Sequence, residues 1–188
     1  VVNDLGGTMD GSGGSSEAAE SVVAEIMAMG GEAIANGGSV SDRAGAQSMV
    51  DDAMNAWGRV DVLINNAGIL RDKSFSKMTL DDFEMVVNVH LLGAAYCSHA
   101  VWPIMREQNY GRILMTTSPS GLYGNFGQTN YGAAKMGQVG LMNSMKIEGA
   151  KNNIHTNSIA PVAATRMTEN LMPEEVLEKL GPELVTPA

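Results

Sequence analysis

The sequence lacks the residues that a disulfide framework, a membrane span or a secretory signal would require. Cys97 is the single cysteine among 188 residues, which excludes an internal disulfide and a metal site built from several cysteines. Apolar runs are short and interrupted, whereas a membrane span needs about 20 consecutive apolar residues. No basic segment is followed by the apolar stretch of a secretory signal. We therefore expect a protein of the reducing cytoplasm.

Positive charge is absent from the first part of the chain. The whole sequence carries 12 Lys+Arg against 21 Asp+Glu, a net charge of −9, and the first basic residue is Arg43. Residues 1–42 therefore hold seven acidic side chains without any basic partner. An acidic protein without a basic patch is poorly suited to nucleic acid or to anionic lipid. We expect neither a nucleic-acid partner nor a membrane partner.

Metal-ligand and nucleophile motifs are also missing. The three histidines, His90, His99 and His155, are scattered, so we expect no metal site and a structural role for each. Neither G-x-S-x-G nor G-x4-G-K-S/T occurs, which leaves hydrolase and P-loop functions without support. Any chemistry must therefore come from other residue types.

The chain does contain an alternation of apolar strands and helices, in a sequence that is 44% hydrophobic and 18% charged. Asp42 and Thr79 are expected helix N-caps, Gly58 a helix stop, and Pro103 the site of a bend. After residue 117, a Ser-, Gly- and Pro-rich stretch predicts a loop. The expected strands cover residues 1–5, 33–35, 60–64, 111–117 and 154–159, and the expected helices cover residues 16–29, 42–57, 80–106, 128–151 and 174–180.

This order predicts an α/β fold. One domain, residues 1–188, would form a doubly wound parallel sheet covered by helices on both faces. Such sheets bind ligands at the carboxyl ends of their strands. The motifs considered next all follow a strand end or lie on the helix after one.

Tyr131 and Lys135 stand at i and i+4, on one face of a helix. An ammonium beside a phenol lowers the pKa of the phenol towards that of a general base. Ser118, thirteen residues earlier, follows a strand and could hydrogen-bond a substrate oxygen; Ser120 competes for this role. Each feature alone also fits an ordinary exposed pair or a turn residue.

The turn Asn65-Asn66-Ala67-Gly68 closes an apolar strand with two amides and small residues. Small residues let a flat ligand approach the edge of the sheet, although a simple polar turn would look the same. Asn88 lies within the following helix, where helix formers are preferred. It is either a buried polar anchor or a solvated residue.

The combination of these features is more specific than any one of them. An Asp-ended strand, the NNAG turn, a mid-helix Asn, S-x12-Y-x3-K and N-x-I-x-P resemble the short-chain dehydrogenase/reductase family over the whole chain. The stretches NAGILRDKSF, YGRILMTTS, GLYGNFGQTNYGAAK and NSIAPVAATRMT are most similar to the (3R)-hydroxyacyl-CoA dehydrogenases of the multifunctional enzyme type 2 kind. The resemblance implies a Rossmann-like oxidoreductase that interconverts 3-hydroxyacyl and 3-oxoacyl thioesters with NAD, NADP being less favoured. It also implies a homodimer or homotetramer formed through the helices near 80–106 and 128–151. A 3-oxoacyl-ACP reductase and a non-catalytic dinucleotide-binding relative are the alternatives.

The resemblance also implies a role for each site residue. Tyr131 would be the general acid/base, Lys135 would lower its pKa and hold the nicotinamide ribose, and Ser118 would orient the substrate oxygen. Asn88 would hold a water that relays protons to Lys135. Asp4 would take the adenosine ribose hydroxyls, which favours NAD. The remaining cofactor contacts would come from Ser39, Val40, Asn66, Ala67, Gly68, Pro161, Val162 and Thr165, together with Tyr131 and Lys135.

The sequence departs from the family pattern in several places. Val162 stands where many relatives have Gly, and Pro119 follows the serine where a small residue is usual. The family's first strand and its Thr-Gly-x3-Gly-x-Gly turn, which holds the pyrophosphate, have no counterpart. The glycines between residues 6 and 14 are expected in a loop, and relatives continue beyond residue 188. We therefore expect a fragment with two unpaired apolar strand edges, prone to aggregate when expressed alone.

Overall fold

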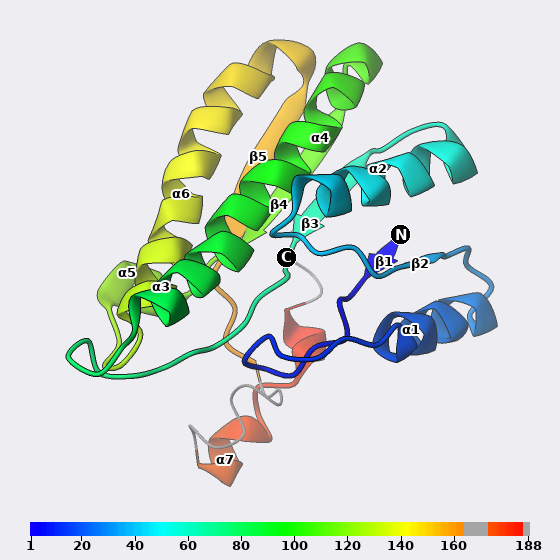
Figure 1. The fold of residues 1–188 in the computed structure, drawn as a ribbon. Coiled ribbons are helices and arrows are strands. Elements are labelled where there is room, and N and C mark those ends of the chain that lie inside the picture. Colours follow the sequence, from blue (N-terminus) through cyan, green and yellow to red (C-terminus); the bar gives the residue numbers. More distant parts are fainter. Residues whose placement is uncertain (164–172, 186–188) are drawn as a thin grey trace.

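The computed structural model describes residues 1–163 and 173–185 of the chain. Thr165, expected at the nicotinamide, lies outside the described residues. Strands and helices alternate along the chain as the sequence predicts (Figure 1). The strands are β1 (Val2–Asn3), β2 (Ala35–Asn36), β3 (Val62–Asn65), β4 (Gly111–Thr116) and β5 (Ile154–Ile159). The helices are α1 (Glu17–Ala28), α2 (Arg43–Trp57), α3 (Leu80–Val87), α4 (Gly93–Gln108), α5 (Pro119–Tyr123), α6 (Thr129–Gly149) and α7 (Glu174–Leu177), with a π turn over Asn88–Leu92 and 3-10 turns over Ala150–Asn152 and Pro182–Leu184.

The strands pair in parallel within two separate sheets. β1 pairs with β2, and β3, β4 and β5 pair in that order, with Ile64 opposite Leu114 and Met115 opposite Ser158. Within the described residues, no strand pairing joins β1 to β3. The predicted parallel α/β architecture is confirmed. β1 and β2 are both shorter than the sequence predicts.

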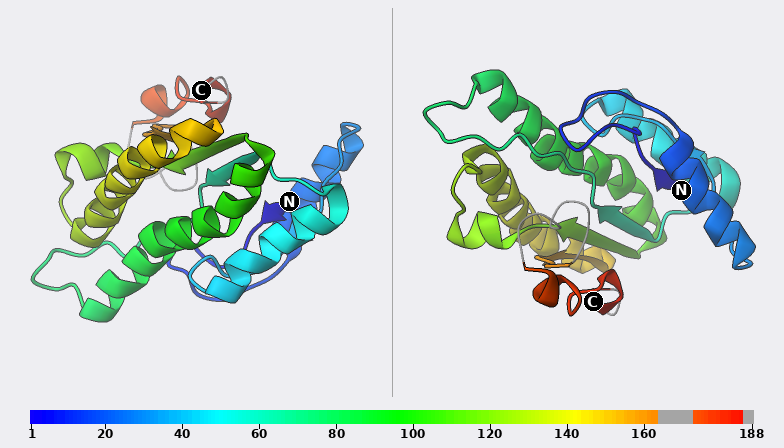
Figure 2. Two further views of the ribbon diagram at one scale, coloured as in Figure 1. Left: turned by 90° about the horizontal axis from the view of Figure 1, so that it is seen from above. Right: turned by 90° about the horizontal axis from the view of Figure 1, so that it is seen from below.

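Helices α4 and α6 pack on one face of the three-stranded sheet and form the core with it (Figure 1). Met105 of α4, Met115 of β4 and Ile154 of β5 are fully buried there. Helix α2 contacts both α4 and β2, so it joins the two sheets (Figure 2). Within each sheet the carboxyl ends of the parallel strands lie along one edge, where ligands of such folds bind.

The opposite face of β3 is open. Val62 and Ile64 are 56% and 60% exposed, although the apolar sequence of this strand predicts burial on both faces. Helix α1 lies on the side of β1 and β2 opposite α2, and it packs on those two strands (Figure 1). The expected cover on both faces is therefore not found at β3 within the described residues.

Side chains and glycine set the helix ends where the sequence predicts them. The Asp42 carboxylate accepts a hydrogen bond from the Gly45 backbone N–H at 3.0 Å, and the Thr79 hydroxyl accepts one from Asp82 N–H at 3.1 Å. Gly58 ends α2 with a φ of 68°, in the left-handed region that glycine adopts without strain. All three predicted boundaries are confirmed.

Two local features differ from the prediction. The stretch after residue 117 is not a plain loop, because Pro119 occupies the first turn of the short helix α5, where its fixed φ suits a helix start. The long helix expected over residues 80–106 is interrupted by the π turn Asn88–Leu92. Pro103 lies inside α4, which continues beyond it to Gln108. Neither feature follows from local sequence, since both depend on what these residues pack against.

The open edge and face of β3 predict self-association of the 188-residue chain. Ile64→Lys should raise the concentration at which the chain aggregates, because a charge on an exposed strand opposes edge-to-edge pairing. Static light scattering against concentration measures this, with circular dichroism to verify the fold. Ile147→Lys is the matched control, since Ile147 of α6 is 73% exposed but lies outside the sheet. Equal effects of the two variants would show that general surface charge, rather than the strand, controls aggregation.

Candidate active site

The carboxyl end of β4 and the first half of α6 are clamped together by two hydrogen bonds. The Thr117 hydroxyl donates to the Lys135 carbonyl oxygen at 2.8 Å, and the Lys135 ammonium donates to the Thr116 carbonyl oxygen. Lys135 is only 3% exposed, and a buried ammonium requires such a partner. Burial lowers the pKa of Lys135 to about 8.

Tyr131 lies one turn before Lys135, and its phenol meets Ser118. The Lys135 Nζ lies 5.4 Å from the centroid of the Tyr131 ring. The Ser118 side chain hydrogen-bonds Tyr131, and its Oγ also accepts from the Ser120 backbone N–H at 3.2 Å as the cap of α5. The structure thus brings Ser118, Tyr131 and Lys135 together. Ser120, the alternative to Ser118, supports that serine through its backbone.

The acid–base state of Tyr131 differs from the sequence prediction. Burial raises the pKa of the Tyr131 phenol above its ordinary value, the charge of Asp72 acts in the same direction, and the Ser118 hydrogen bond opposes both. The i, i+4 spacing predicts a pKa lowered by Lys135. The structure reverses this direction because desolvation of the buried phenol disfavours the phenolate.

The segment after the NNAG turn holds the start of α6. Asn130 donates from Nδ2 to the Arg71 carbonyl oxygen at 3.1 Å, and Gln128 donates from Nε2 to the Asp72 carboxylate at 2.7 Å. Arg71 also pairs with Asp82 of α3 at 3.1 Å. These contacts fix Tyr131 relative to the end of β3. These contacts were not predicted, although the charged run 71–73, two residues after the NNAG turn, was a signal for them.

Most of the expected dinucleotide contacts follow strand ends, whereas Tyr131 and Lys135 lie on α6. Asp4 follows β1, and its exposed carboxylate accepts the backbone N–H two residues further on at 2.6 Å. Residues 39–40 follow β2, and residues 66–68 follow β3 with the first two exposed. Pro161 and Val162 follow β5. Within each sheet these positions share the edge formed by the carboxyl ends of parallel strands.

The π turn places two polar residues beside α6. Asn88 opens the turn and is half-buried, and its side-chain amide has no hydrogen-bond partner among the described residues. His90 is 2% exposed. Its ring lies 5.1 Å from the Tyr131 ring, at 86° to it. Since π turns are often found at functional sites, the contact of His90 with Tyr131 extends the purely structural role expected for this histidine.

A glycine-rich loop covers the turn after β3. The Leu70 backbone N–H donates to the Met9 carbonyl at 2.8 Å, and Arg71 Nε donates to the Asp10 carbonyl at 2.9 Å. Hydrogen bonds from Thr8 and Ser12 lower the pKa of the exposed Asp10 carboxyl to about 2. Residues 6–14 are thus a loop, as predicted, and the loop lies at the edge expected to bind dinucleotide.

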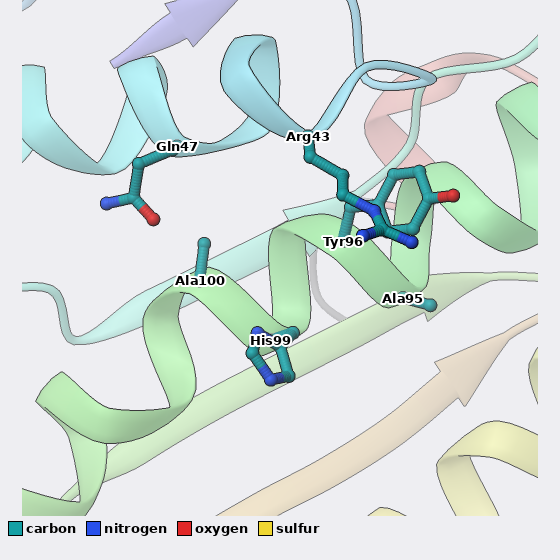
Figure 3. A pocket seen from close by; sticks show the side chains of 6 residues that line it. All are labelled: Arg43, Gln47, Ala95, Tyr96, His99 and Ala100. Carbon is teal, nitrogen blue, oxygen red and sulfur yellow. The ribbon is translucent and has the colours of Figure 1, made fainter.

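A groove of about 450 Å³ is found among the described residues outside the candidate active site. It lies between α2 and α4, and the Arg43 guanidinium sits 5.3 Å above the Tyr96 ring there (Figure 3). Its lining contains none of the expected site residues; it is formed by Arg43, Gln47, Ala95, Tyr96, His99 and Ala100. Among residues 1–163 and 173–185, no cluster of His, Cys, Asp and Glu is arranged to hold a metal ion. None of the described helices is both long and apolar enough to cross a membrane.

Known proteins resemble the chain throughout its length. Peroxisomal multifunctional enzyme type 2 of Mus musculus is 54% identical over 187 residues, which are 100% of this chain and 25% of that protein. The 3-oxoacyl-[acyl-carrier-protein] reductase of Synechocystis is 42% identical over 165 residues, covering 87% of this chain and 67% of the relative. The chain therefore spans about a quarter of the mouse protein.

Solved structures and a family model agree with these relatives. A 7α-hydroxysteroid dehydrogenase, solved with NADH and 7-oxo glycochenodeoxycholic acid, superposes with a TM-score of 0.81 at 29% identity, over 95% of this chain and 66% of that one. The short chain dehydrogenase family model matches residues 7–176, and the expected resemblance is confirmed. The chain belongs to the short-chain dehydrogenase/reductase family.

Proposed function

We propose that this chain transfers a hydride between NAD and the 3-position of a 3-hydroxyacyl or 3-oxoacyl thioester, with a (3R)-hydroxyacyl-CoA as substrate. One observation carries the proposal. The Ser118 side chain hydrogen-bonds the phenol of Tyr131, and the buried Lys135 lies one turn further along the same helix. A binding module has no need of this arrangement. The multifunctional and 3-oxoacyl relatives support the choice of an acyl thioester.

The edge formed by the strand ends fits a nicotinamide dinucleotide. Asp4 offers an exposed carboxylate, and the exposed Asn66 and Ala67 leave the backbone at the end of β3 accessible. Gly68 follows them in the same turn, and its missing side chain makes room for the His90 ring. These residues, with Pro161 and Val162, would hold the dinucleotide, which supplies the hydride chemistry when bound.

The chain's own residues provide the proton and the orientation. The raised pKa of Tyr131 keeps the phenol protonated, which suits proton donation to a carbonyl oxygen during reduction. Ser118 would orient that oxygen through its hydroxyl. In the oxidative direction Tyr131 accepts the proton instead, and the phenolate gains stability when the Lys135 ammonium turns from the Thr116 carbonyl towards it.

Two alternatives lead to different observations. A reductase for acyl-carrier-protein thioesters would use the same residues but prefer the protein-bound acyl group to the CoA ester. A non-catalytic relative would bind dinucleotide without transferring hydride. Turnover of C4 to C16 3-hydroxyacyl-CoA and of the corresponding carrier-protein esters separates the three. A homodimer or homotetramer formed through α4 and α6, and a cytoplasmic location, stay predictions.

Tyr131→Phe should lower turnover by about 10²–10⁴-fold, because it removes the transferable proton and keeps the ring. Dinucleotide affinity should change far less. Steady-state kinetics and a binding titration on the complete protein measure the two quantities. Tyr123→Phe is the matched control, since Tyr123 is 88% exposed. Near-wild-type turnover of Tyr131→Phe would refute the assigned mechanism.

Ser118→Ala should raise the pKa of Tyr131 further, because the Ser118 hydrogen bond is the interaction that lowers it against burial. The phenolate absorbance of the protein, minus that of its Tyr131→Phe counterpart, reports this titration. Ser120→Ala serves as the control, since Ser120 meets Ser118 through its backbone N–H. An unchanged Tyr131 titration in Ser118→Ala would mean that the two side chains do not interact in solution.

Asp4→Ser combined with Leu5→Arg should shift the cofactor preference from NAD towards NADP. A carboxylate accepts hydrogen bonds from the ribose hydroxyls but repels the additional phosphate of NADP. The unaltered protein should favour NAD on the order of 10²-fold. The ratio of kcat/KM for the two cofactors is the measurement, and Asp10→Ser controls for the loss of one nearby negative charge. Equal use of both cofactors by the unaltered protein would show that Asp4 does not face the ribose.

A further inference from the structure

We propose that His90 is a positioning residue, an imidazole wedged between the Gly68–Ile69 turn and the Tyr131 ring that sets the distance between dinucleotide and acid/base. This inference rests on the proposed function and deepens it. It assigns His90 no direct contact with substrate. Three sets of contacts carry it.

The first contact is a clasp on the backbone of Ile69. His90 Nε2 lies 3.0 Å from the Ile69 backbone nitrogen and 2.8 Å from its carbonyl oxygen. In one tautomer Nε2 accepts from the N–H, and in the other it donates to the carbonyl, so either form holds the same residue. Nδ1 is buried without a partner among the described residues. An apolar ring would fill this volume without that unsatisfied nitrogen, so the polar ring indicates that the clasp matters.

The second contact is with Gly68. A Cβ added there would lie 2.3 Å from His90 Cε1 and 3.1 Å from each ring nitrogen. The imidazole therefore packs directly on the Gly68 backbone, at a distance that a side chain at position 68 would not allow. The same turn carries the backbone expected to line the dinucleotide. A displacement of the ring would thus move the turn.

The third set of contacts reaches α6. The His90 and Tyr131 rings form an edge-to-face pair, with centroids 5.1 Å apart and planes at 86°. The His90 carbonyl oxygen accepts a hydrogen bond from Gln138 Nε2 at 2.8 Å. Gln138 lies three residues after Lys135 on α6. His90 therefore contacts α6, the helix that carries Tyr131, through both its side chain and its backbone.

His90 does not act as a second acid/base, because its ring is held in the uncharged form. Burial, reinforced by the charge of Lys135, lowers the pKa of His90 to about 3, against a smaller opposing effect of its Ile69 hydrogen bond. The ring is therefore uncharged over the working range. It fixes geometry next to Tyr131 without adding a proton donor of its own.

Two substitutions each keep one of the contacts of the imidazole, either the ring contact with Tyr131 or the hydrogen bond to Ile69. His90→Phe keeps an aromatic ring against Tyr131 but loses the clasp on Ile69. His90→Gln keeps an amide that can bond Ile69 but loses the ring. In the complete protein we expect His90→Phe to weaken dinucleotide binding more than His90→Gln does. His90→Gln should lower kcat by about 10–10²-fold, because small displacements of a catalytic group have effects of this size, and KM for the acyl substrate should change little.

His99→Phe changes an exposed histidine of α4 and should leave both quantities unchanged. If the unaltered protein transfers no hydride to any thioester, the proposed function fails. If it is active and both His90 variants retain its kcat and dinucleotide affinity, or lose both in parallel, the positioning role is overturned. Should both substitutions prevent folding, Gly68→Ala tests the wedge with His90 in place. The added methyl group would meet the imidazole and should lower kcat, and a normal kcat would overturn the proposal.

Discussion

A reciprocal pair of hydrogen bonds between β4 and α6 holds the candidate site together. Thr117 donates to the Lys135 carbonyl, and the Lys135 ammonium donates to the Thr116 carbonyl. A buried ammonium cannot remain unpaired at acceptable cost, so this clamp fixes both the rotation of α6 and its height above the sheet. Tyr131, one turn earlier, is thereby carried to Ser118. The phenol is buried in this arrangement, and burial is the largest cause of its raised pKa.

The turn after β3 is the second fixed point of the site. The backbone of residues 69–71 meets the glycine-rich loop, the His90 ring and the start of α6 through hydrogen bonds. This short segment therefore fixes the positions of the glycine-rich loop, the His90 ring and the start of α6 relative to one another. A dinucleotide at this edge and an acid/base on α6 would be held in register by that segment, without the need for a contact between them. The π turn contributes because it is what places His90 within reach of both.

Local sequence patterns were enough to predict the order of strands and helices and several of the helix ends. Asp42, Thr79 and Gly58 act within a few residues of their own positions, so local rules suffice for them. Parallel pairing follows from the alternation of apolar strands with helices. The exact extent of β5, residues 154–159, was also predicted, because this strand is long and paired along its whole length.

The interactions among the residues of the candidate site depend on packing between elements far apart in the chain. The π turn, the short helix α5 and the division into two sheets depend on partners far along the chain, which no local pattern contains. The Tyr131 pKa illustrates the limit. Spacing places Lys135 on the same helix face, but the direction of its ammonium and the burial of the phenol are set by β4 and α5. His90 likewise became informative once the fold brought it against Gly68, Ile69 and Tyr131. Sequence specifies which groups are present, and packing decides the distances and the desolvation that control their chemistry.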